Sequence, residues 1–331
     1  MPKVAIVILN YNGKSFLNTF LPSVVEHSAE HEIIIADNAS TDDSVAFLNS
    51  NYPKVRIIGL SKNWGFAEGY NAALKQIKAD YYVLLNSDVE VTPHWINPII
   101  DIMQSNTKIA ACQPKIKDFK RKTYFEYAGA AGGYIDWLGY PFCRGRIFDT
   151  CEEDTGQYDD TKEIFWATGA CMFVRADVFH QAGGFDSQFF AHMEEIDICW
   201  RIKNLGYQIY YCPTSVVYHV GGGTLHKSNP RKTFLNYRNG LAMLYKNLPS
   251  DKLFSTIFLR LVLDGISGIK LLLDGSFKDV WAILKAHFAF YGMIPRLERK
   301  DPKQLGQVYN KSIVLEYFLR KKKYFSDLDI F

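Results

Sequence analysis

The chain has 331 residues, of which 48% are hydrophobic, so a large folded core is expected and intrinsic disorder is excluded. Its six cysteines form no C-x-x-C pair, which argues against a disulfide scaffold or a zinc site and fits a reducing cytosol. The net charge is +3, but it is unevenly distributed: residues 227–331 hold 19 Lys and Arg against 9 Asp and Glu, so the body of the chain is acidic and its end is basic. No nucleic-acid motif accompanies the basic end, so we expect it to meet a membrane surface rather than nucleic acid.

The first ninety residues alternate between continuous apolar runs and helical patterns. We predict strands at 3–9, 32–36, 55–60 and 81–85, and helices at 14–27, 42–50 and 66–78. Thr41 or Asp42 is the expected cap of the second helix, and Thr92 with Pro93 is expected to begin a fourth helix. This order of elements predicts an α/β fold with a doubly wound, mostly parallel sheet.

Polar residues follow every predicted strand of this sheet. They are Asn10, Tyr11 and Asn12 after the first strand, Asp37 and Asn38 after the second, Asn63 after the third, and Asn86, Ser87 and Asp88 after the fourth. Because ligands of doubly wound sheets bind at the carboxyl ends of the strands, we expect these residues to form one binding site.

The second half of the chain is less regular. Residues 106–165 contain short apolar pieces, glycines and an acidic loop, and their pattern assigns no order of elements. Beyond them we predict a helix at 194–205, strands at 208–211 and 215–219, and a glycine-rich loop at 221–223 that could close over a ligand.

The last hundred residues are predicted to be helical. The segment 253–273 is long and apolar, but Arg260, Asp264 and Lys270 interrupt it, so we do not interpret it as a membrane span. At about 100° per residue, these charges and Asp274 fall within an arc of about 120°. One charged face and a broad apolar face predict a helix that lies in a lipid interface, packs on the main domain or forms a homodimer.

Several residues of the predicted site suggest particular chemistry. Asp88, at the end of a buried strand, could hold a hard divalent cation that bridges two phosphates. Asp37 could accept the imide N–H of uracil or thymine while Tyr11 lies against the base. Asn63 and Asn71 flank a predicted helix N-terminus, which suits ribose or phosphate contacts. Each of these residues alone would more often be a cap or a turn residue.

Two further segments carry ionisable groups. Glu194 and Glu195 open a predicted helix, and a carboxylate in a partly apolar pocket has a raised pKa and can act as a general base. Asp197 could belong to the site or simply pair with Arg201 one turn later. His219 ends a strand, and a neutral imidazole is a good ligand for manganese-like cations.

Taken together, these segments resemble the family 2 glycosyltransferases of the GT-A fold, and among them the rhamnosyltransferase-like branch. The resemblance extends from about residue 4 to about residue 240. The matching pieces are VAIVILNYN, DNASTDDS, NWGFAEGYNAAL, YYVLLNSDVEV, GACMFVRADVFHQAGGFD and FFAHMEEIDICWRIKNLGYQIYYCPTSVVYH.

The resemblance implies a role for each matching position. Asp37 would bind the nucleobase, Asp88 and His219 would bind a divalent metal, Mn²⁺ or Mg²⁺, and Glu195 would be the catalytic base with Glu194 beside it. The residues assigned to the nucleotide-sugar donor are Asn10, Tyr11, Asn12, Asp37, Asn38, Asn63, Gly65, Asn71, Asn86, Ser87, Asp88, Arg231 and Arg238. Those assigned to the acceptor or the transferred sugar are Trp166, Gly169 and Asp197, with core packing as the alternative for Trp166.

The chain departs from the family pattern in four places. Asn86 replaces the first carboxylate of the Asp-x-Asp metal motif, and Glu195 replaces the aspartate that is the usual base. Tyr70 stands where many members carry an arginine. The Q-x-x-R-W motif of processive synthases is absent, which favours transfer of a single sugar.

We therefore expect an inverting, non-processive hexosyltransferase that moves one sugar from dTDP-rhamnose, a UDP-hexose or a UDP-HexNAc to a cell-surface glycan or a polyprenyl-linked acceptor. Residues 1–240 would form the GT-A domain, with a Rossmann-like nucleotide-sugar half at 1–105 and an acceptor half at 106–240, followed by a basic helical extension at 241–331. Its expected place is the cytoplasm, at the inner face of the plasma membrane.

Two other functions were weighed. A nucleotidyltransferase would need a basic, glycine-rich loop after the first strand, where this chain has only NYNGKSF. A non-catalytic nucleotide-sugar-binding scaffold is the alternative that the incomplete Asp-x-Asp motif leaves open.

Overall fold

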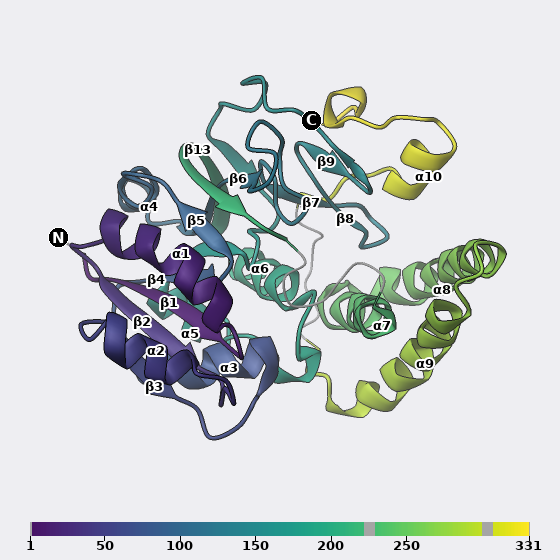
Figure 1. Cartoon of the computed structure of the whole chain (residues 1–331). Helices are drawn as coiled ribbons and strands as arrows, with labels where there is room; N and C mark the ends of the chain where they lie inside the picture. Colours follow the sequence, from purple (N-terminus) through teal and green to yellow (C-terminus); the bar gives the residue numbers. More distant parts are fainter. Residues whose placement is uncertain (1, 222–228, 300–306, 331) are drawn as a thin grey trace.

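The computed structural model of the protein describes residues 2–221, 229–299 and 307–330, and its centre is a mixed sheet with helices on both faces (Figure 1). The predicted alternation of residues 3–86 is confirmed, with small shifts at the ends of elements. The strands of this part are β1 (Val4–Asn10), β2 (Glu32–Asp37), β3 (Arg56–Gly59), β4 (Tyr81–Asn86) and β5 (Val89–Val91). Its helices are α1 (Lys14–His27), α2 (Ser44–Asn51), α3 (Gly65–Leu74) and α4 (Asn97–Ser105).

The part of the chain that sequence patterns left unassigned forms one long strand and a small antiparallel sheet, with strand order β10-β9-β8-β7. The strands are β6 (Ile109–Asp118), β7 (Gly133–Ile135), β8 (Pro141–Cys143), β9 (Arg146–Ile147), β10 (Thr150–Cys151), β11 (Lys162–Ile164), β12 (Cys171–Arg175) and β13 (Gln208–His219). The helices between them are α5 (Ala176–Gln181), the short 3₁₀ helix η1 (Ser187–Phe189) and α6 (Glu194–Asn204).

The strand order explains where a ligand would bind. In the described residues the central sheet runs β11-β13-β6-β12-β4-β1-β2-β3, with β5 beside β13. Strands β1 to β4 are parallel to one another, β6 and β13 run the same way, and β12 is antiparallel between β4 and β6. Because β2 and β3 extend to one side of β1 and β4 to the other, the chain switches direction at β1, and such a switch point opens a crevice at the carboxyl ends.

Strand β1 buries both of its faces, as its continuous apolar sequence predicts. Ala5 and Val7 belong to the core that includes α3, whereas Ile6 and Ile8 belong to the core that includes α1 and α4. The sheet is therefore covered on both sides, and its ends are the surface left for a ligand.

Two predicted elements were wrong, one after Thr92 and one between residues 208 and 219. The fourth helix does not begin at Pro93 but at Asn97, because Thr92 Oγ1 donates to the carbonyl oxygen of Val216 (2.7 Å) and His94 has a φ of +60°. The two strands predicted at 208–211 and 215–219 are the single strand β13, in which a register shift absorbs the irregular residues between Cys212 and Val216.

The C-terminal helices form a separate layer at the right of Figure 1. They are α7 (Pro230–Asn247), α8 (Ser250–Leu273), α9 (Phe277–Met293), η2 (Ile294–Arg296), α10 (Ile313–Phe318) and η3 (Phe325–Asp327). Helix α7 contacts α6 and spans residue 240, where the sequence analysis places the end of the GT-A domain. Within the described ranges, none of the helices combines the length and the apolar character that crossing a bilayer requires.

Candidate active site

The polar residues that follow the parallel strands meet at one edge of the sheet. In the register of β1 and β2, Asn10 lies beside Asp37, and Asn10 Nδ2 donates to Asp37 Oδ1 (3.1 Å). Asn38, after β2, donates from Nδ2 to Asn63 Oδ1 (3.1 Å), after β3. On the other side of β1, β4 ends at Asn86. The structure therefore brings together residues that are far apart in the sequence, as the strand ends predicted.

Asp37 and Tyr11 are the two residues of this edge that the sequence assigns to the base, and Asp37, like Asn38, is buried. The Asp37 carboxylate accepts the side-chain N–H of Asn10 and the backbone N–H of Ser40 (3.0 Å to Oδ2), which uses about half of its acceptor capacity. The Tyr11 side chain is 46% exposed and has its ring free for stacking.

The neighbouring amides instead shape the loops. Asn12 Oδ1 accepts the backbone N–H of Thr41 (2.7 Å), and Asn38 Oδ1 accepts that of Trp64 (2.9 Å). Asn38 is also buried. Both side chains hold the binding edge in shape through these hydrogen bonds.

The N-terminus of α3 is already occupied, contrary to the prediction that it faces a phosphate. The carbonyl oxygen of Phe190 accepts the backbone N–H groups of Phe66 (2.7 Å) and Ala67 (3.2 Å). Gly65 has a φ of +75°, and a Cβ added there would lie 2.5 Å from the Phe190 ring, so this glycine permits the close approach of helix and loop.

Asn71 also lies away from the strand ends. Its Nδ2 donates to the carbonyl oxygen of Phe185 (2.7 Å), and its Oδ1 accepts the backbone N–H of Phe185 (3.0 Å). These two hydrogen bonds fix the segment that leads into η1, so Asn71 supports the site and does not line it.

Asp88 and His219 meet where β5 pairs with β13. His219 lies opposite Val89 in the register, and His219 Nε2 is 3.2 Å from Asp88 Oδ1. The other ring nitrogen, Nδ1, is 3.2 Å from Glu126 Oε2. All three side chains are buried. Sequence reasoning missed Glu126, because it belongs to the stretch whose elements could not be assigned.

This cluster is strongly charged. Burial opposes the charge of His219, but Glu126 and Asp88 outweigh it and raise the pKa of the imidazole to about 10. Burial likewise opposes the charge of Asp88, yet the nearby His219 holds the pKa of this carboxyl below its usual value. The imidazole of His219 therefore lies between two carboxylates, and a cation would bind at Nε2 by replacing the proton there.

Asp88 and His219 carry the oxygen and nitrogen donors that a divalent cation takes. Two neighbouring ligands of an octahedral cation lie about 3 Å apart, close to the distance between Asp88 Oδ1 and His219 Nε2. Glu126 would orient the imidazole through the other nitrogen, as carboxylates do beside metal-bound histidines. Over residues 2–221, 229–299 and 307–330 no group of three or more His, Cys, Asp or Glu is placed to hold a metal, so phosphate oxygens and water would complete the shell.

Glu194 and Glu195 form the first turn of α6, as predicted. Burial raises the pKa of both carboxyls, that of Glu194 well above its usual range and that of Glu195 to about 7. One carboxyl oxygen of each, Oε2, is buried and has no hydrogen-bond partner among the described residues. An unpartnered carboxylate with a raised pKa is suited to take a proton from a bound hydroxyl.

Gly169 links this base to the strand ends. A Cβ added at Gly169 would lie 3.9 Å from the Cβ of Glu195 and 3.2 Å from the ring of Phe66. The next residue, Ala170, accepts the backbone N–H of Asn86 (3.0 Å), two residues before Asp88. The absence of a side chain at Gly169 therefore lets the ring of Phe66 and the first turn of α6 approach the end of β4 closely.

The loop before α6 holds an unusual backbone conformation. Phe190, His192 and Met193 have φ values of +65°, +70° and +72°, a region that residues with a Cβ rarely adopt. Burial lowers the pKa of His192 to about 4, so its imidazole is neutral at pH 7. Such strain persists only where surrounding contacts impose it, and it is common beside active sites.

Helix α7 supplies those contacts through Arg238 and Asn239. Arg238 Nη2 donates to the carbonyl oxygens of Gln188 and Phe189 (both 3.0 Å), which ties α7 to this loop. Asn239 is completely buried. Its Nδ2 lies 2.7–2.9 Å from three carbonyl oxygens, those of Phe189, Ala191 and His192.

We expect the substitution Asn239→Leu to lower kcat by about 100-fold and to destabilise the fold by about 1–3 kcal/mol. We expect the loss of kcat because a displacement of the base-bearing loop by about 1 Å can slow the reaction by about 100-fold. We expect the loss of stability because the buried carbonyl oxygens lose their hydrogen-bond donor. Steady-state kinetics and thermal unfolding measure the two effects. Tyr237→Phe is the matched control, since it removes a hydrogen bond of the same helix to Ser267 Oγ (2.6 Å) without touching the loop. Equal kcat values for the two variants would contradict this positioning role.

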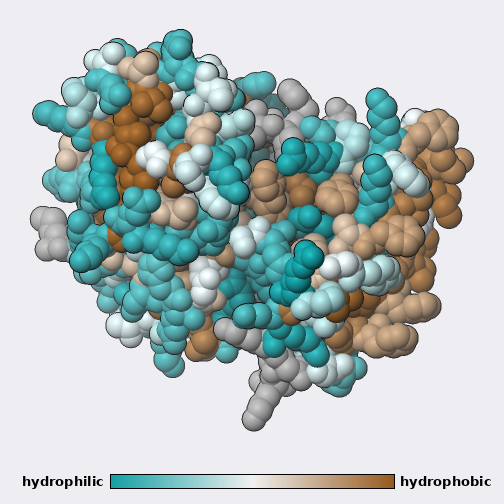
Figure 2. Space-filling view, turned by 90° about the horizontal axis from the view of Figure 1, so that it is seen from below, coloured by the Kyte–Doolittle hydropathy of each residue, from teal (hydrophilic) through white to brown (hydrophobic). Residues whose placement is uncertain are grey.

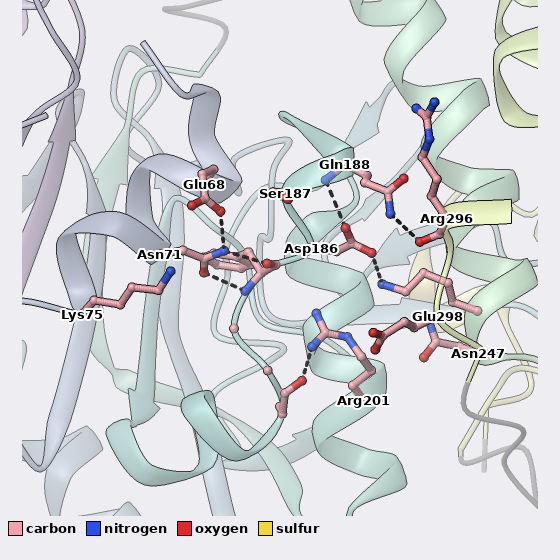
Figure 3. A pocket seen from close by; sticks show the side chains of 15 residues that line it. Glu68, Asn71, Lys75, Asp186, Ser187, Gln188, Arg201, Asn247, Arg296 and Glu298 are labelled. Atoms are coloured by element: carbon pink, nitrogen blue, oxygen red, sulfur yellow. Dashed lines mark hydrogen bonds and ion pairs between the residues drawn. The ribbon is translucent and has the colours of Figure 1, made fainter. Parts of the chain in front are cut away.

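A polar pocket of about 390 Å³ lies behind the same loop (Figure 3). Asn71 enters it from α3, Arg201 from α6 and Arg296 from η2, and Gln188 Nε2 donates to the carbonyl oxygen of Arg296 (2.9 Å). Its side chains are bonded mainly to one another and to the loop backbone, so we interpret it as support for the base-bearing loop.

Asp197 belongs to this supporting network. It is completely buried, with Oδ2 2.7 Å from Arg201 Nη2 and 3.0 Å from Lys246 Nζ. Burial opposes its charge, but Arg201 and Lys246 hold its pKa below the usual value. The structure supports the pairing of Asp197 with Arg201, which the sequence offered as the alternative to a place in the acceptor site.

Two other assigned residues differ in their availability. Trp166 is buried and its Nε1 donates to the carbonyl oxygen of Tyr134 (2.8 Å), so it packs in the core and cannot stack on a sugar. Arg231 is exposed at the start of α7, with its guanidinium 4.9 Å from the Phe190 ring centre. Of the predicted glycine loop only Gly221 is described, with a φ of +69°, and residues 222 and 223 lie outside the described residues.

Comparison with known proteins agrees with this geometry. The family Glycosyl transferase family 2 matches residues 5–183, just over half of the chain. N-acetylglucosaminyl-diphospho-decaprenol L-rhamnosyltransferase of Mycobacterium tuberculosis is 26% identical over 230 residues, which cover 65% of this chain and 75% of that protein. Rhamnosyltransferase WbbL of Escherichia coli K12 is 24% identical over 225 residues, covering 65% of this chain and 83% of WbbL.

Two solved structures share the fold. GalNAc-T7 with UDP, GalNAc and Mn²⁺ has a TM-score of 0.58 at 17% identity, covering 74% of this chain, which spans about half (48%) of that one. The mannosyltransferase PcManGT from Pyrobaculum calidifontis, with GDP-Man and Mn²⁺, has a TM-score of 0.51 at 13% identity, covering 89% of this chain and 75% of that one. The central domain therefore has the GT-A fold.

Proposed function

This chain belongs to glycosyl transferase family 2 and is a glycosyltransferase, and on that premise we propose that it is an inverting, non-processive enzyme that transfers one sugar from a UDP- or dTDP-sugar. The observation that supports this most is Glu195, whose pKa is raised by burial and whose Oε2 has no hydrogen-bond partner among the described residues. The named rhamnosyltransferase relatives favour dTDP-rhamnose, with UDP-hexose and UDP-HexNAc as the other candidates.

The proposed reaction is a single displacement. Glu195 takes the proton of the acceptor hydroxyl as its oxygen bonds to the anomeric carbon, while the bond from that carbon to the diphosphate breaks and the nucleoside diphosphate leaves. The acceptor attacks from the face opposite the leaving group, so the configuration inverts. Residues 1–105 would hold the donor and residues 106–240 the acceptor.

Asp88 and His219 are the residues proposed to hold a divalent cation, Mn²⁺ or Mg²⁺, with Glu126 orienting the imidazole. When bound, the cation supplies positive charge at the departing diphosphate. Asp37 would accept the imide N–H of the base, and Tyr11 would stack on its ring.

We infer that the acceptor is a polyprenyl-linked or cell-surface glycan, and that the protein works peripherally at the inner face of the plasma membrane. The Mycobacterium tuberculosis relative is named for a decaprenol-linked acceptor. The excess of Lys and Arg after residue 227 suits an anionic surface.

A thermal-shift screen tests the donor class. We expect UDP- or dTDP-sugars to raise the melting temperature in the presence of Mn²⁺, because a ligand that binds only the native state stabilises it. ADP-glucose is the matched control for UDP-glucose, since adenine offers no imide N–H to Asp37. If ADP-glucose raises the melting temperature as much as UDP-glucose, or if no nucleotide sugar raises it, the proposed donor site is wrong.

The raised pKa of Glu195 predicts the pH dependence of the reaction. Only the deprotonated carboxylate accepts a proton, so kcat/KM should rise with pH up to about 7 and level off above that value. Because the folded pKa exceeds the unfolded one, the same group favours folding at low pH and loses this contribution as pH rises through about 7. A kcat/KM profile that stays flat down to about pH 5 would show that Glu195 is not the base.

A further inference from the structure

Helices α8 and α9 carry an unpartnered apolar face on the side of the molecule away from β2 and β3 (Figure 1). We name it the hairpin face. On α8 it consists of Phe254, Phe258, Val262, Ile266, Ile269 and Leu273, all between 44% and 84% exposed. On α9 it consists of Phe277, Trp281, Leu284, Phe288 and Tyr291, between 45% and 76% exposed. These residues recur every three or four positions, so each set forms one stripe, and Figure 2 shows the apolar surface at its right-hand side.

The polar side of α8 points into the protein, which is the reverse of an ordinary surface helix. Thr256, Arg260 and Asp264 are its buried residues. Arg260 Nη1 donates to the carbonyl oxygen of Leu138 (3.0 Å), and its guanidinium lies 3.7 Å from the centre of the Tyr140 ring. Arg260 and Asp264, two of the charged residues that interrupt this apolar segment, therefore fix α8 to the main domain.

The same contacts extend to α9. Asp264 accepts the hydroxyl of Tyr140 (3.3 Å to Oδ1), and its Oδ2 is 3.2 Å from His287 Nε2. Arg260 and Asp264 also pair with each other. A buried ion pair with these partners is costly to break, so the helices cannot rotate to bury their apolar side against the protein. Helix α8 therefore packs on the main domain, as one of the readings of the sequence has it, but it does so through Arg260 and Asp264 and leaves its apolar stripe exposed.

The charges beside the hairpin face indicate what covers it. Lys252 and Lys270 are exposed on one edge of the α8 stripe, and Lys278 and Lys285 on one edge of the α9 stripe, each about 80–100° from the middle of its stripe at 100° per residue. Lys270 also pairs with the exposed Asp274 (2.8 Å). Lysine is depleted in protein–protein interfaces, whereas beside an apolar stripe it can place its ammonium group among anionic lipid headgroups. A lipid surface thus fits both the aromatic stripe and its lysine edges.

We propose that the hairpin face inserts into one leaflet of an anionic membrane and holds the catalytic domain at its surface. The role of this membrane binding rests on the proposed function, because a lipid-linked acceptor is reached only at a membrane surface. Membrane binding itself does not depend on sugar transfer, since α8 and α9 are already fixed with their apolar side outward and binding needs no rearrangement of the fold.

Co-flotation of the full-length protein with vesicles tests the proposal. Phosphatidylcholine vesicles containing about one third phosphatidylglycerol should bind the wild type, and the variant Phe254→Ser, Ile269→Ser, Phe288→Ser should bind at least about 100-fold more weakly, because three large apolar side chains no longer enter the lipid. All three positions are exposed, so the fold should persist, as the melting temperature will verify. Leu205→Ser, at an exposed leucine on the end of α6, is the control and should bind like the wild type.

A second variant tests the charges. Replacing Lys252, Lys270, Lys278 and Lys285 by Gln should remove the preference for anionic over neutral vesicles, by about fivefold for each lysine. The proposal is overturned if the wild type does not float, if the serine variant floats equally well, or if sedimentation shows a dimer that the serine substitutions dissociate. Donor-induced thermal shifts of the serine variant should equal those of the wild type, so a failure here is distinct from a failure of the donor site.

Discussion

The substitution Glu195→Gln is expected to lower kcat for sugar transfer by about 10²- to 10⁴-fold, the usual contribution of a general base. Glutamine has the same size and keeps the first turn of α6 intact, but its amide cannot take a proton. The carboxyl it replaces has a pKa raised by burial and no partner for Oε2 within the described part of the chain, so little else depends on its charge. Donor binding, followed by thermal shift, should remain unchanged.

Glu195→Asp and Glu194→Gln complete this test. Aspartate retains the base and restores the residue that the family usually carries, so Glu195→Asp should keep part of the activity, with its pH profile still rising toward neutrality. Glu194→Gln should affect kcat far less if Glu195 alone is the base. A Glu195→Gln enzyme with wild-type kcat, or one that loses activity only through unfolding, would remove Glu195 from the mechanism.

The substitution Asp88→Asn is expected to abolish the Mn²⁺-dependent part of donor binding and to lower kcat by about 10²- to 10³-fold. The substitution removes the anionic ligand next to His219 Nε2. Without this ligand the protein would no longer hold the cation that offsets charge on the departing diphosphate. Thermal shifts with a nucleotide sugar, with and without Mn²⁺, measure the first effect, and steady-state kinetics the second.

Asp118→Asn is the matched control for Asp88→Asn. Asp118 lies opposite His219 in the pairing of β6 with β13, but its carboxylate accepts backbone N–H groups of Lys120 (2.8 Å) and Arg121 (3.0 Å) in a surface turn. Its loss should leave the Mn²⁺ response intact. Glu126→Gln, which weakens the orientation of His219, should lower metal affinity by about 10- to 100-fold. An Asp88→Asn protein that still binds donor in a Mn²⁺-dependent way would rule out the proposed metal site.

Much of the fold and the binding edge follows from local sequence patterns. The buried runs and the polar residues after them, such as Asn10, Asp37 and Asn86, predict both the parallel strands and their meeting at one edge, because topology alone aligns the carboxyl ends. Likewise, Glu194 and Glu195 can be placed on a helix start from the apolar spacing that follows them.

The contacts that depend on long-range packing could not be predicted. Glu126 reaches His219 from a segment with no regular pattern. The positive φ values of Phe190, His192 and Met193 are imposed by α7, so a local reading shows only an aromatic loop. The same limit applies to Asn71 and Gly65. Their sequence positions suggested contacts with the donor, but in the structure they hold that loop.

Helix α8 shows a different limit. Its pattern reveals one charged and one apolar face, but periodicity does not say which face meets the protein. The answer depends on Tyr140 and His287, which are distant in sequence and offer Asp264 its hydrogen bonds. Only the assembled structure shows that the apolar face points outward.

The most direct test of the account is the anomeric configuration of the product, measured by NMR with the nucleotide sugar that the thermal-shift screen identifies and a polyprenyl-diphosphate-linked or glycan acceptor. A single displacement with Glu195 as base predicts a product whose anomeric configuration is opposite to that of the donor, formed by the wild type and not by Glu195→Gln. A product that retains the donor's configuration would contradict the single displacement, and equal product formation by Glu195→Gln would contradict the role of its base.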